Sequence, residues 1–278
     1  MAFKTPVLDR VPTYPGRVKL TPVAGATNTY DMVRADSPIE EGTPLNKALL
    51  DQKAYTLTQD VTVYVDGAAG NDTTGDGTSA MPFATIQKAA DSLPKWLDGY
   101  TATISITAGT YEERVVLNGF QGGALKLGTS NRSVTVRGVQ IDACSMVHID
   151  VNITRSSLGG TPLNIKNGSD VVFVGDRVID GGSANVSGVV VESGSTLSSP
   201  MLASGAARKT TINNCKYYGI YATESSRVSL GELAGSGNGV GLYVTDGSVA
   251  SYHSYTMTAG TGGITASGGR IYGGAQIY

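Results

Sequence analysis

The chain has 278 residues, of which 21 are basic, 23 are acidic and 37 are glycine. A chain of this length can bury a substantial core. Its nearly balanced charge argues against nucleic-acid binding, which normally needs a basic face. The glycines follow no Gly-X-Y period, which excludes collagen. The start has no apolar signal core and no run approaches ~18 apolar residues. We therefore expect neither a signal peptide nor membrane insertion.

Residues 1–60 are rich in proline and poor in glycine. Proline at this density, without long periodic runs, predicts an extended and mostly irregular arm that docks on another protein. A short helix is expected where Thr43 can cap the chain and Pro44 can occupy the first helical position. Residues 1–60 are accordingly interpreted as an attachment arm.

Residues 61–100 are expected to form a strand, a loop and a capping helix. Residues 61–65 alternate β-branched and aromatic side chains, as a strand does. A loop rich in turn residues follows over 66–77. Residues 82–93 then fit one amphipathic helix, which Pro94 ends. The residues expected on its buried face are Phe83, Ile86, Ala90 and Leu93.

Residues 101–278 consist of short β-type runs separated by Gly, Asn, Asp and Ser, and the last part repeats every 22 residues. The repeated runs begin at Gly219, Gly241 and Gly263. An earlier copy begins at Gly188, and an insertion around residues 198–209 accounts for its wider spacing. Less regular runs upstream fit further turns; they cover residues 104–106, 115–117, 134–136, 147–151 and 171–174.

This repeat predicts an all-β parallel solenoid, in which each turn buries its apolar face against the next. Roughly six or seven stacked turns are expected. The helix over 82–93 would cover the N-terminal end, where unpaired strand edges would otherwise attract other chains. A β-sandwich is the alternative fold, because irregular Gly-rich strands also suit it.

Two parts of the sequence resemble a known family. The segment Tyr64-Val65-Asp66, Gly70-Asn71-Asp72, Gly75-Asp76-Gly77 and Pro82-Phe83-Ala84-Thr85-Ile86-Gln87-Lys88-Ala89 resembles the start of right-handed parallel β-helix domains of pectate-lyase type, above all those of phage tail spikes and tail fibres. Residues 1–60 resemble N-terminal arms of tail or baseplate proteins in phages and prophages of Gram-positive hosts. That second resemblance is carried by Leu8-Asp9-Arg10, Pro15-Gly16-Arg17-Val18-Lys19-Leu20, Asn28-Thr29-Tyr30-Asp31 and Glu41-Gly42-Thr43-Pro44-Leu45-Asn46.

The resemblance implies a homotrimeric virion protein of the tail or baseplate, made in the host cytoplasm. Residues 1–60 would join tail or baseplate proteins, and the β-helix would point at a glycan or protein of the host surface. The arm residues expected to make the attachment are Leu8, Arg10, Tyr14, Arg17, Tyr30 and Leu45.

Many tail spikes of this fold cleave polysaccharide with paired carboxylates, which must lie about 5–9.5 Å apart. Glu224 and Asp246 align one repeat apart, but the next copy has Gly268. They are weak catalytic candidates, because acidic residues are also favoured at solvated turns. A lyase would need Arg227 or Arg270 beside a metal, and neither has an acidic cluster near it in sequence.

Metal and redox chemistry have little support. The loop with Asp66, Asn71, Asp72 and Asp76 lacks EF-hand spacing, so we interpret it as turn chemistry. Cys144 and Cys215 fit no CxxC motif and are expected to be buried apolar thiols, although the sequence leaves a disulfide open. We expect no metal and no cofactor.

Tyrosines offer the better binding signal, because eight of the 14 fall in the last 62 residues. A tyrosine presents a flat apolar face with a hydroxyl group. Tyr221 and Tyr243 are in register, which favours a core or trimer-interface stack. The side chains between the stacked runs are the candidate receptor or glycan contacts: Tyr252, His253, Tyr255 and Tyr272.

The predicted function is that of a non-enzymatic virion adhesin with an attachment arm at 1–60, a strand, loop and capping helix at 61–100, and a β-helix at 101–278. Two alternatives remain open. One is a polysaccharide depolymerase, either a glycoside hydrolase or a lyase. The other is a purely architectural connector fibre.

Overall fold

The computed structural model describes residues 11–12, 18–22, 24, 30–34, 38–40, 56–128, 133–155, 159–200 and 205–273. The chain divides into two compact units, Ala2–Ala54 and Tyr55–Tyr278.

The first unit contains two antiparallel pairs of short strands. β1 (Val11–Pro12) pairs with β4 (Pro38–Glu40), and β2 (Val18–Pro22) pairs with β3 (Tyr30–Arg34). Mostly irregular chain was expected here, and neither pair was predicted from the sequence. Prolines stand at strand ends in this unit, where a missing N–H group is tolerated. Of the predicted attachment residues, Tyr30 begins β3 opposite Pro22. The others, and the helix expected after Thr43, lie outside the described residues; they are Leu8, Arg10, Tyr14, Arg17 and Leu45.

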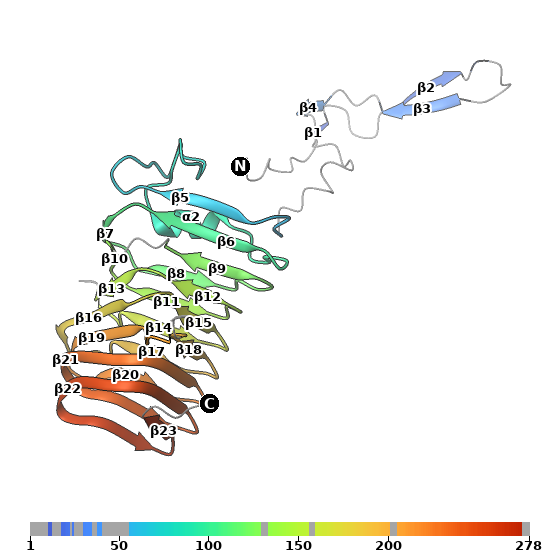
Figure 1. Cartoon of the computed structure of the whole chain (residues 1–278). Helices are drawn as coiled ribbons and strands as arrows, with labels where there is room; N and C mark the ends of the chain where they lie inside the picture. The colour runs from blue at the N-terminus through green and yellow to red at the C-terminus, as the bar shows by residue number, and fades with distance from the viewer. Residues whose placement is uncertain are drawn as a thin grey trace. The chain divides into compact units, whose positions relative to one another are not determined.

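The second unit is a parallel β-solenoid of about seven turns (Figure 1). Its strands form three ladders, which we name faces A, B and C. Two long strands, β21 (Arg227–Thr245) and β22 (Val249–Ser267), contribute to all three faces because they continue through the corners. This architecture confirms the predicted solenoid and excludes the β-sandwich.

The remaining strands each belong to one face. Face A contains β5 (Val61–Val65), β6 (Thr101–Ile106), β9 (Ala124–Leu127), β12 (Val147–Ile149), β15 (Asp170–Phe173), β18 (Thr196–Ser198) and β23 (Arg270–Gly273). Face B contains β7 (Gly109–Tyr111), β10 (Val134–Val136), β13 (Asn152–Thr154), β16 (Arg177–Ala184) and β19 (Lys209–Cys215). Face C contains β8 (Val115–Asn118), β11 (Val139–Asp142), β14 (Leu163–Lys166), β17 (Val189–Val191) and β20 (Tyr218–Ala222).

The core is a set of apolar columns that run from turn to turn. On face A, Ile104 lies opposite Leu127, which lies opposite Ile149, and Ile149 lies opposite Phe173. All four are fully buried. Cys144 and Cys215 are also buried and are free thiols, as expected. The 22-residue repeat is confirmed too, because Tyr221 pairs with Tyr243.

The corner between faces C and A uses left-handed backbone at every turn. The first corner residue has a positive φ at Asn167, Ser193, Glu224, Asp246 and Gly268. Two residues later a buried serine usually follows, and in three of these serines, though not in Ser226, the hydroxyl oxygen accepts a hydrogen bond from the backbone of the preceding turn. Such bonds reach Ser169 Oγ from Cys144 N, Ser195 Oγ from Ser169 N and Ser248 Oγ from Ser226 N. These serines satisfy backbone N–H groups that no ladder reaches at the corner.

The helix α2 (Ile86–Ser92) covers the N-terminal end of the solenoid, as predicted. It begins four residues later than expected, because Thr85 caps it and Phe83 is still extended. Phe83 N donates to Tyr64 O, and Asp66 N donates to Phe83 O. The Glu113 carboxylate accepts hydrogen bonds from Ile86 N at 2.7 Å and Gln87 N at 2.9 Å. A distant acid therefore satisfies the first N–H groups of a helix that has no acid in its own first turn.

Candidate functional site

Three tyrosines gather on the outer side of face C, towards the C-terminal end of the solenoid. Tyr218 and Tyr221 belong to β20, and Tyr243 belongs to β21. Ile220 and Ala222 point into the core and are fully buried. Because side chains alternate along a strand, Tyr221 points outwards, and the parallel register places Tyr243 beside it. We call these three residues the tyrosine cluster.

The rings of the tyrosine cluster pack against one another. The centroids of Tyr218 and Tyr243 lie 4.7 Å apart and their planes differ by 8°. Tyr221 lies 5.7 Å from Tyr243 and 5.2 Å from Tyr218. Each ring is half-buried. Stacking of this kind fixes the rings and leaves a rigid aromatic surface with three hydroxyl groups.

The cluster interrupts an otherwise small or polar column of outward side chains. On the preceding turns this column consists of Val116, Gln140, Asn164 and Val190. On the next turn, Tyr243 lies opposite Thr265, which is exposed and much smaller than a tyrosine. Tyr217, next to the cluster in sequence, is 55% exposed. The aromatic surface is therefore confined to two neighbouring turns.

Two of the tyrosines predicted to contact a receptor, Tyr252 and Tyr255, lie at core positions in the last full turn. Tyr252 lies opposite Leu230, and Tyr255 lies opposite Leu233. Their ring centroids are 5.5 Å apart. The Tyr255 hydroxyl donates to Gly263 O at 2.5 Å, and burial raises its pKa. We call Tyr252 and Tyr255 the C-terminal tyrosine pair, which packs against the end of the core.

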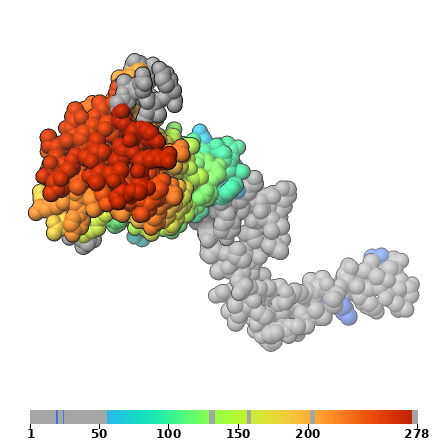
Figure 2. Space-filling view, turned by 90° about the horizontal axis from the view of Figure 1, so that it is seen from below, coloured from blue at the N-terminus to red at the C-terminus, as the bar shows by residue number. Residues whose placement is uncertain are grey.

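The other two predicted contacts, His253 and Tyr272, are exposed. Tyr272 is 48% exposed on the outer side of face A, opposite Ser251. Figure 2 shows the end of the solenoid to which these C-terminal strands belong. Of the four predicted residues, His253 and Tyr272 are thus exposed, whereas Tyr252 and Tyr255 are half-buried.

Glu224 and Asp246 occupy two of the left-handed corner positions, with φ values of 55° and 48°. Ser193 Oγ donates to Glu224 Oε2 at 2.7 Å. Thr223 Oγ1 and Thr245 Oγ1 donate to Asp246 Oδ2 at 2.8 and 3.0 Å, and these bonds hold the pKa of Asp246 below its ordinary value. A general acid for glycoside cleavage needs a raised pKa. Asp246 is therefore suited to holding the corner and not to donating a proton.

The acidic loop after β5 is built from turns in which a side chain binds nearby backbone. Asp66 Oδ1 accepts from Ala68 N and Ala69 N, and Asn71 Oδ1 accepts from Thr73 N and Thr74 N. This is the turn chemistry that the sequence predicted. Over the described residues, no three His, Cys, Asp or Glu side chains lie close enough to hold a metal ion. Within the same part of the chain, no helix is long and apolar enough to cross a membrane.

Comparisons of the chain with known protein families, with curated proteins and with solved structures find no match. Function is therefore inferred from the residues of this chain.

Two members of the tyrosine cluster, Tyr221 and Tyr243, were predicted from the sequence to stack, either in the core or at a trimer interface. The signal for their outward position was present, because Tyr221 and Tyr243 each stand between two apolar residues in a run of alternating side chains. Tyr218 carries no such signal. Its ring meets Tyr243 only because the turns stack in this register.

Proposed function

We propose that this protein is a virion fibre of the tail or baseplate that contacts the host surface without cutting it. The single observation that carries the proposal is the tyrosine cluster, a rigid aromatic surface on the outer side of a solenoid. The resemblance of the segment from Tyr64 to Ala89 to the start of phage tail β-helices supports the virion assignment.

A surface of tyrosines suits an adhesin for physical reasons. Each ring offers apolar area to the CH groups of a sugar or to a protein side chain, and each hydroxyl group can donate or accept a hydrogen bond. The mutual stacking of the rings lowers the entropy lost on binding. In the proposed homotrimer, three such surfaces would act together, so that weak individual contacts give useful avidity.

The remaining parts of the proposal concern assembly. Residues 1–60 would attach to tail or baseplate proteins, and the solenoid would carry the binding surface towards a glycan or protein of the host. This division of labour is supported by the separation of the chain into two compact units.

The experiment uses the full chain, purified and incubated with washed cell envelopes from a panel of Gram-positive bacteria. Light scattering of the same preparation gives the oligomeric state, for which three copies are expected. Replacing two rings of the cluster in Tyr218→Ser/Tyr243→Ser should lower envelope binding by about tenfold or more. Tyr100→Ser, which removes a tyrosine at the opposite end of the solenoid, is the matched control.

Each alternative function has its own outcome in this experiment. Release of reducing sugar from the envelopes would overturn the adhesin in favour of a depolymerase, and Glu224→Gln and Asp246→Asn would then be the first variants to examine. A trimer that binds no envelope would identify a connector. Unchanged binding by the double variant would exclude the tyrosine cluster as the contact surface.

A further inference from the structure

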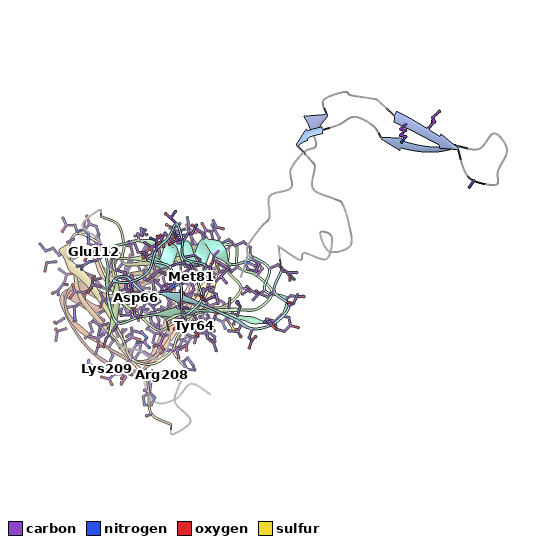
Figure 3. The ribbon with its side chains drawn as sticks, turned by 90° about the horizontal axis from the view of Figure 1, so that it is seen from above. Tyr64, Asp66, Met81, Glu112, Arg208 and Lys209 are labelled. Carbon is purple, nitrogen blue, oxygen red and sulfur yellow. The ribbon has the colours of Figure 1, made fainter. Side chains whose placement is uncertain are left out.

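A second feature at the other end of the solenoid has the character of a ligand site. It is an open pocket of about 320 Å³ on the side of the first two turns. Three stretches of chain line it: the end of β5, the loop before α2 and the end of β6. The lining residues are Tyr64, Val65, Asp66, Ser79, Pro82, Ser105, Ile106 and Thr107. In Figure 3, Tyr64 and Asp66 are labelled together with Met81, which belongs to the same loop.

The loop that forms one wall of the pocket is held firmly against β5. Tyr64 N donates to Gly77 O, and Phe83 N donates to Tyr64 O, both at 2.9 Å. The loop also passes so close to itself that a Cβ atom on Gly70 would lie 2.1 Å from Phe83 O. Such contact requires glycine at that position. The pocket is therefore formed before any ligand arrives, as most small-molecule sites are.

Tyr111 ties the start of the loop before α2 to the end of β6. It is buried beneath the corner between faces A and B. Its hydroxyl oxygen accepts a bond from Gly67 N at 3.2 Å and donates to Thr107 O at 3.1 Å. The start of the loop and the end of β6 are thus tied to one buried side chain.

The groups around the pocket are hydroxyl-rich and carry one negative charge. Tyr64, Ser79, Ser105 and Thr107 all carry a hydroxyl group, and that of Thr107 already bonds the Tyr111 hydroxyl at 3.0 Å. Hydrogen bonds from Ala69 N and Ala68 N hold the pKa of Asp66 below its ordinary value, so this carboxylate is ionised at neutral pH. Both bonds end on Oδ1, so Oδ2 keeps acceptor capacity towards a hydroxyl donor.

This lining selects against most ligand classes. Asp66 would repel an anion, and no lysine or arginine lines the pocket to offset it. A calcium ion needs six to eight oxygen ligands and usually several carboxylates, whereas the pocket has one carboxylate. A purely apolar ligand would remove water from the charged carboxylate of Asp66 without pairing it. An uncharged polyhydroxyl molecule satisfies all of these conditions.

We propose that this pocket binds one neutral sugar residue. The sugar ring lies against Tyr64, whose side chain is 37% exposed, and a sugar hydroxyl donates to Asp66 Oδ2. The Ser79 hydroxyl hydrogen-bonds another hydroxyl group of the sugar. The site is separate from the tyrosine cluster of face C, and its occupation does not depend on the function proposed for that cluster.

The test measures saturation-transfer NMR on the full chain with D-glucose, D-galactose and N-acetyl-D-glucosamine as separate probes, in a buffer that contains EDTA. At least one sugar should bind, with a dissociation constant of about 1 mM. Tyr64→Ala and Asp66→Asn should each weaken that binding about tenfold or more. Asp66→Asn keeps a side-chain oxygen for Ala68 N and Ala69 N, so it preserves the turn.

Two control variants match these changes. Tyr100→Ala removes a tyrosine of nearly equal exposure, 38%, outside the pocket, and Asp76→Asn alters another turn-forming acid of the same loop. Both should bind sugar as the parent does. The proposal is overturned if none of the three sugars binds in EDTA, or if binding survives Asp66→Asn undiminished. Should Tyr64→Ala fail to fold, Asp66→Asn decides alone.

Discussion

The side-chain amide of Gln87 forms two hydrogen bonds with the backbone of Val116. Its Oε1 accepts from Val116 N at 2.7 Å, and its Nε2 donates to Val116 O at 3.2 Å. Val116 lies in β8, the first strand of face C. One residue of the capping helix thus makes the pair of bonds that a further strand would make, and protects an edge at which another chain could pair.

Replacing Gln87 with leucine should therefore expose this edge. We expect Gln87→Leu to lower the free energy of unfolding by about 1–3 kcal/mol, because two backbone groups lose their partner. Urea denaturation measures the loss. Lys88→Leu, at an exposed position of the same helix, is the control and should change stability by less than about 0.5 kcal/mol. Equal effects of the two variants would contradict the role given to Gln87.

The bonds between the loop residue Asp72 and the start of α2 should stabilise the fold less in acid than at neutral pH. Burial pushes the pKa of Asp72 upwards, but hydrogen bonds from the Thr85 hydroxyl and from the N–H groups of Thr85 and Ala84 outweigh it and lower the pKa below its ordinary 3.8. As pH falls through 3.8, the unfolded chain takes up a proton before the folded chain does, and the stability contributed by these bonds is lost. That contribution is fully present at neutral pH.

Asp72→Asn separates this effect from general acid unfolding. The variant should be less stable than the parent at neutral pH, and the difference should shrink when urea unfolding is repeated below about pH 4. Asp91→Asn, on the exposed side of α2, is the control. A difference between parent and Asp72→Asn that stays constant with pH would argue against an ionised Asp72 in the folded protein.

A buried ion pair joins Asp150, which follows β12, to Arg177, which begins β16. Arg177 is only 2% exposed and also donates to Val174 O. Removing the acid alone in Asp150→Ala leaves a buried charge and should cost about 3–5 kcal/mol in urea unfolding. The double variant Asp150→Leu/Arg177→Met should recover part of that loss, because no charge then stays buried. A double variant less stable than Asp150→Ala would contradict this interpretation.

The C-terminal tyrosine pair should contribute to stability, whereas Tyr272 should not. A Cβ atom on Gly241 would lie 1.9 Å from the Tyr255 hydroxyl, which shows how closely this ring covers the glycines of face C. Tyr255→Ala should lower the free energy of unfolding by about 2 kcal/mol. Tyr272→Ala removes an exposed ring and should stay within about 0.5 kcal/mol of the parent. Thermal melts of both variants provide the measurement. A larger loss of stability in Tyr272→Ala than in Tyr255→Ala would contradict the prediction.

The regular part of the fold was predictable because residues that stand one repeat apart in the sequence of a solenoid pair with each other in neighbouring turns. Gly219 and Gly241 stand one repeat apart, and the strands that follow them pair as the repeat requires. The insertion was also predicted correctly, since β18 ends at Ser198 and β19 begins at Lys209. The helix boundary was less predictable, because Pro82 suits both a first helical turn and the extended segment it occupies.

The candidate sites were less predictable, because they depend on contacts between turns and loops. Alternation of apolar and polar residues along a strand predicts which side chains share a face. It does not predict at which turn the buried core of the solenoid ends. Tyr252 and Tyr255 consequently looked exposed in the sequence, although their register with Leu230 and Leu233 makes them core positions. The sugar pocket is lined by residues of β5, β6 and the loop before α2, which meet because β5 stacks on β6 and because Tyr111 bonds both Gly67 and Thr107.

The three ladders also determine how the solenoid responds to mechanical load. The hydrogen bonds between turns run along the long axis, so a pull in that direction loads faces A, B and C in parallel. A turn can detach only when its bonds on all three faces break together. β21 and β22 pair from Arg227 and Val249 through to Thr245 and Ser267, across the A–B and B–C corners, with register shifts between Gly235 and Val240. These two turns are therefore the part of the rod best able to carry tension.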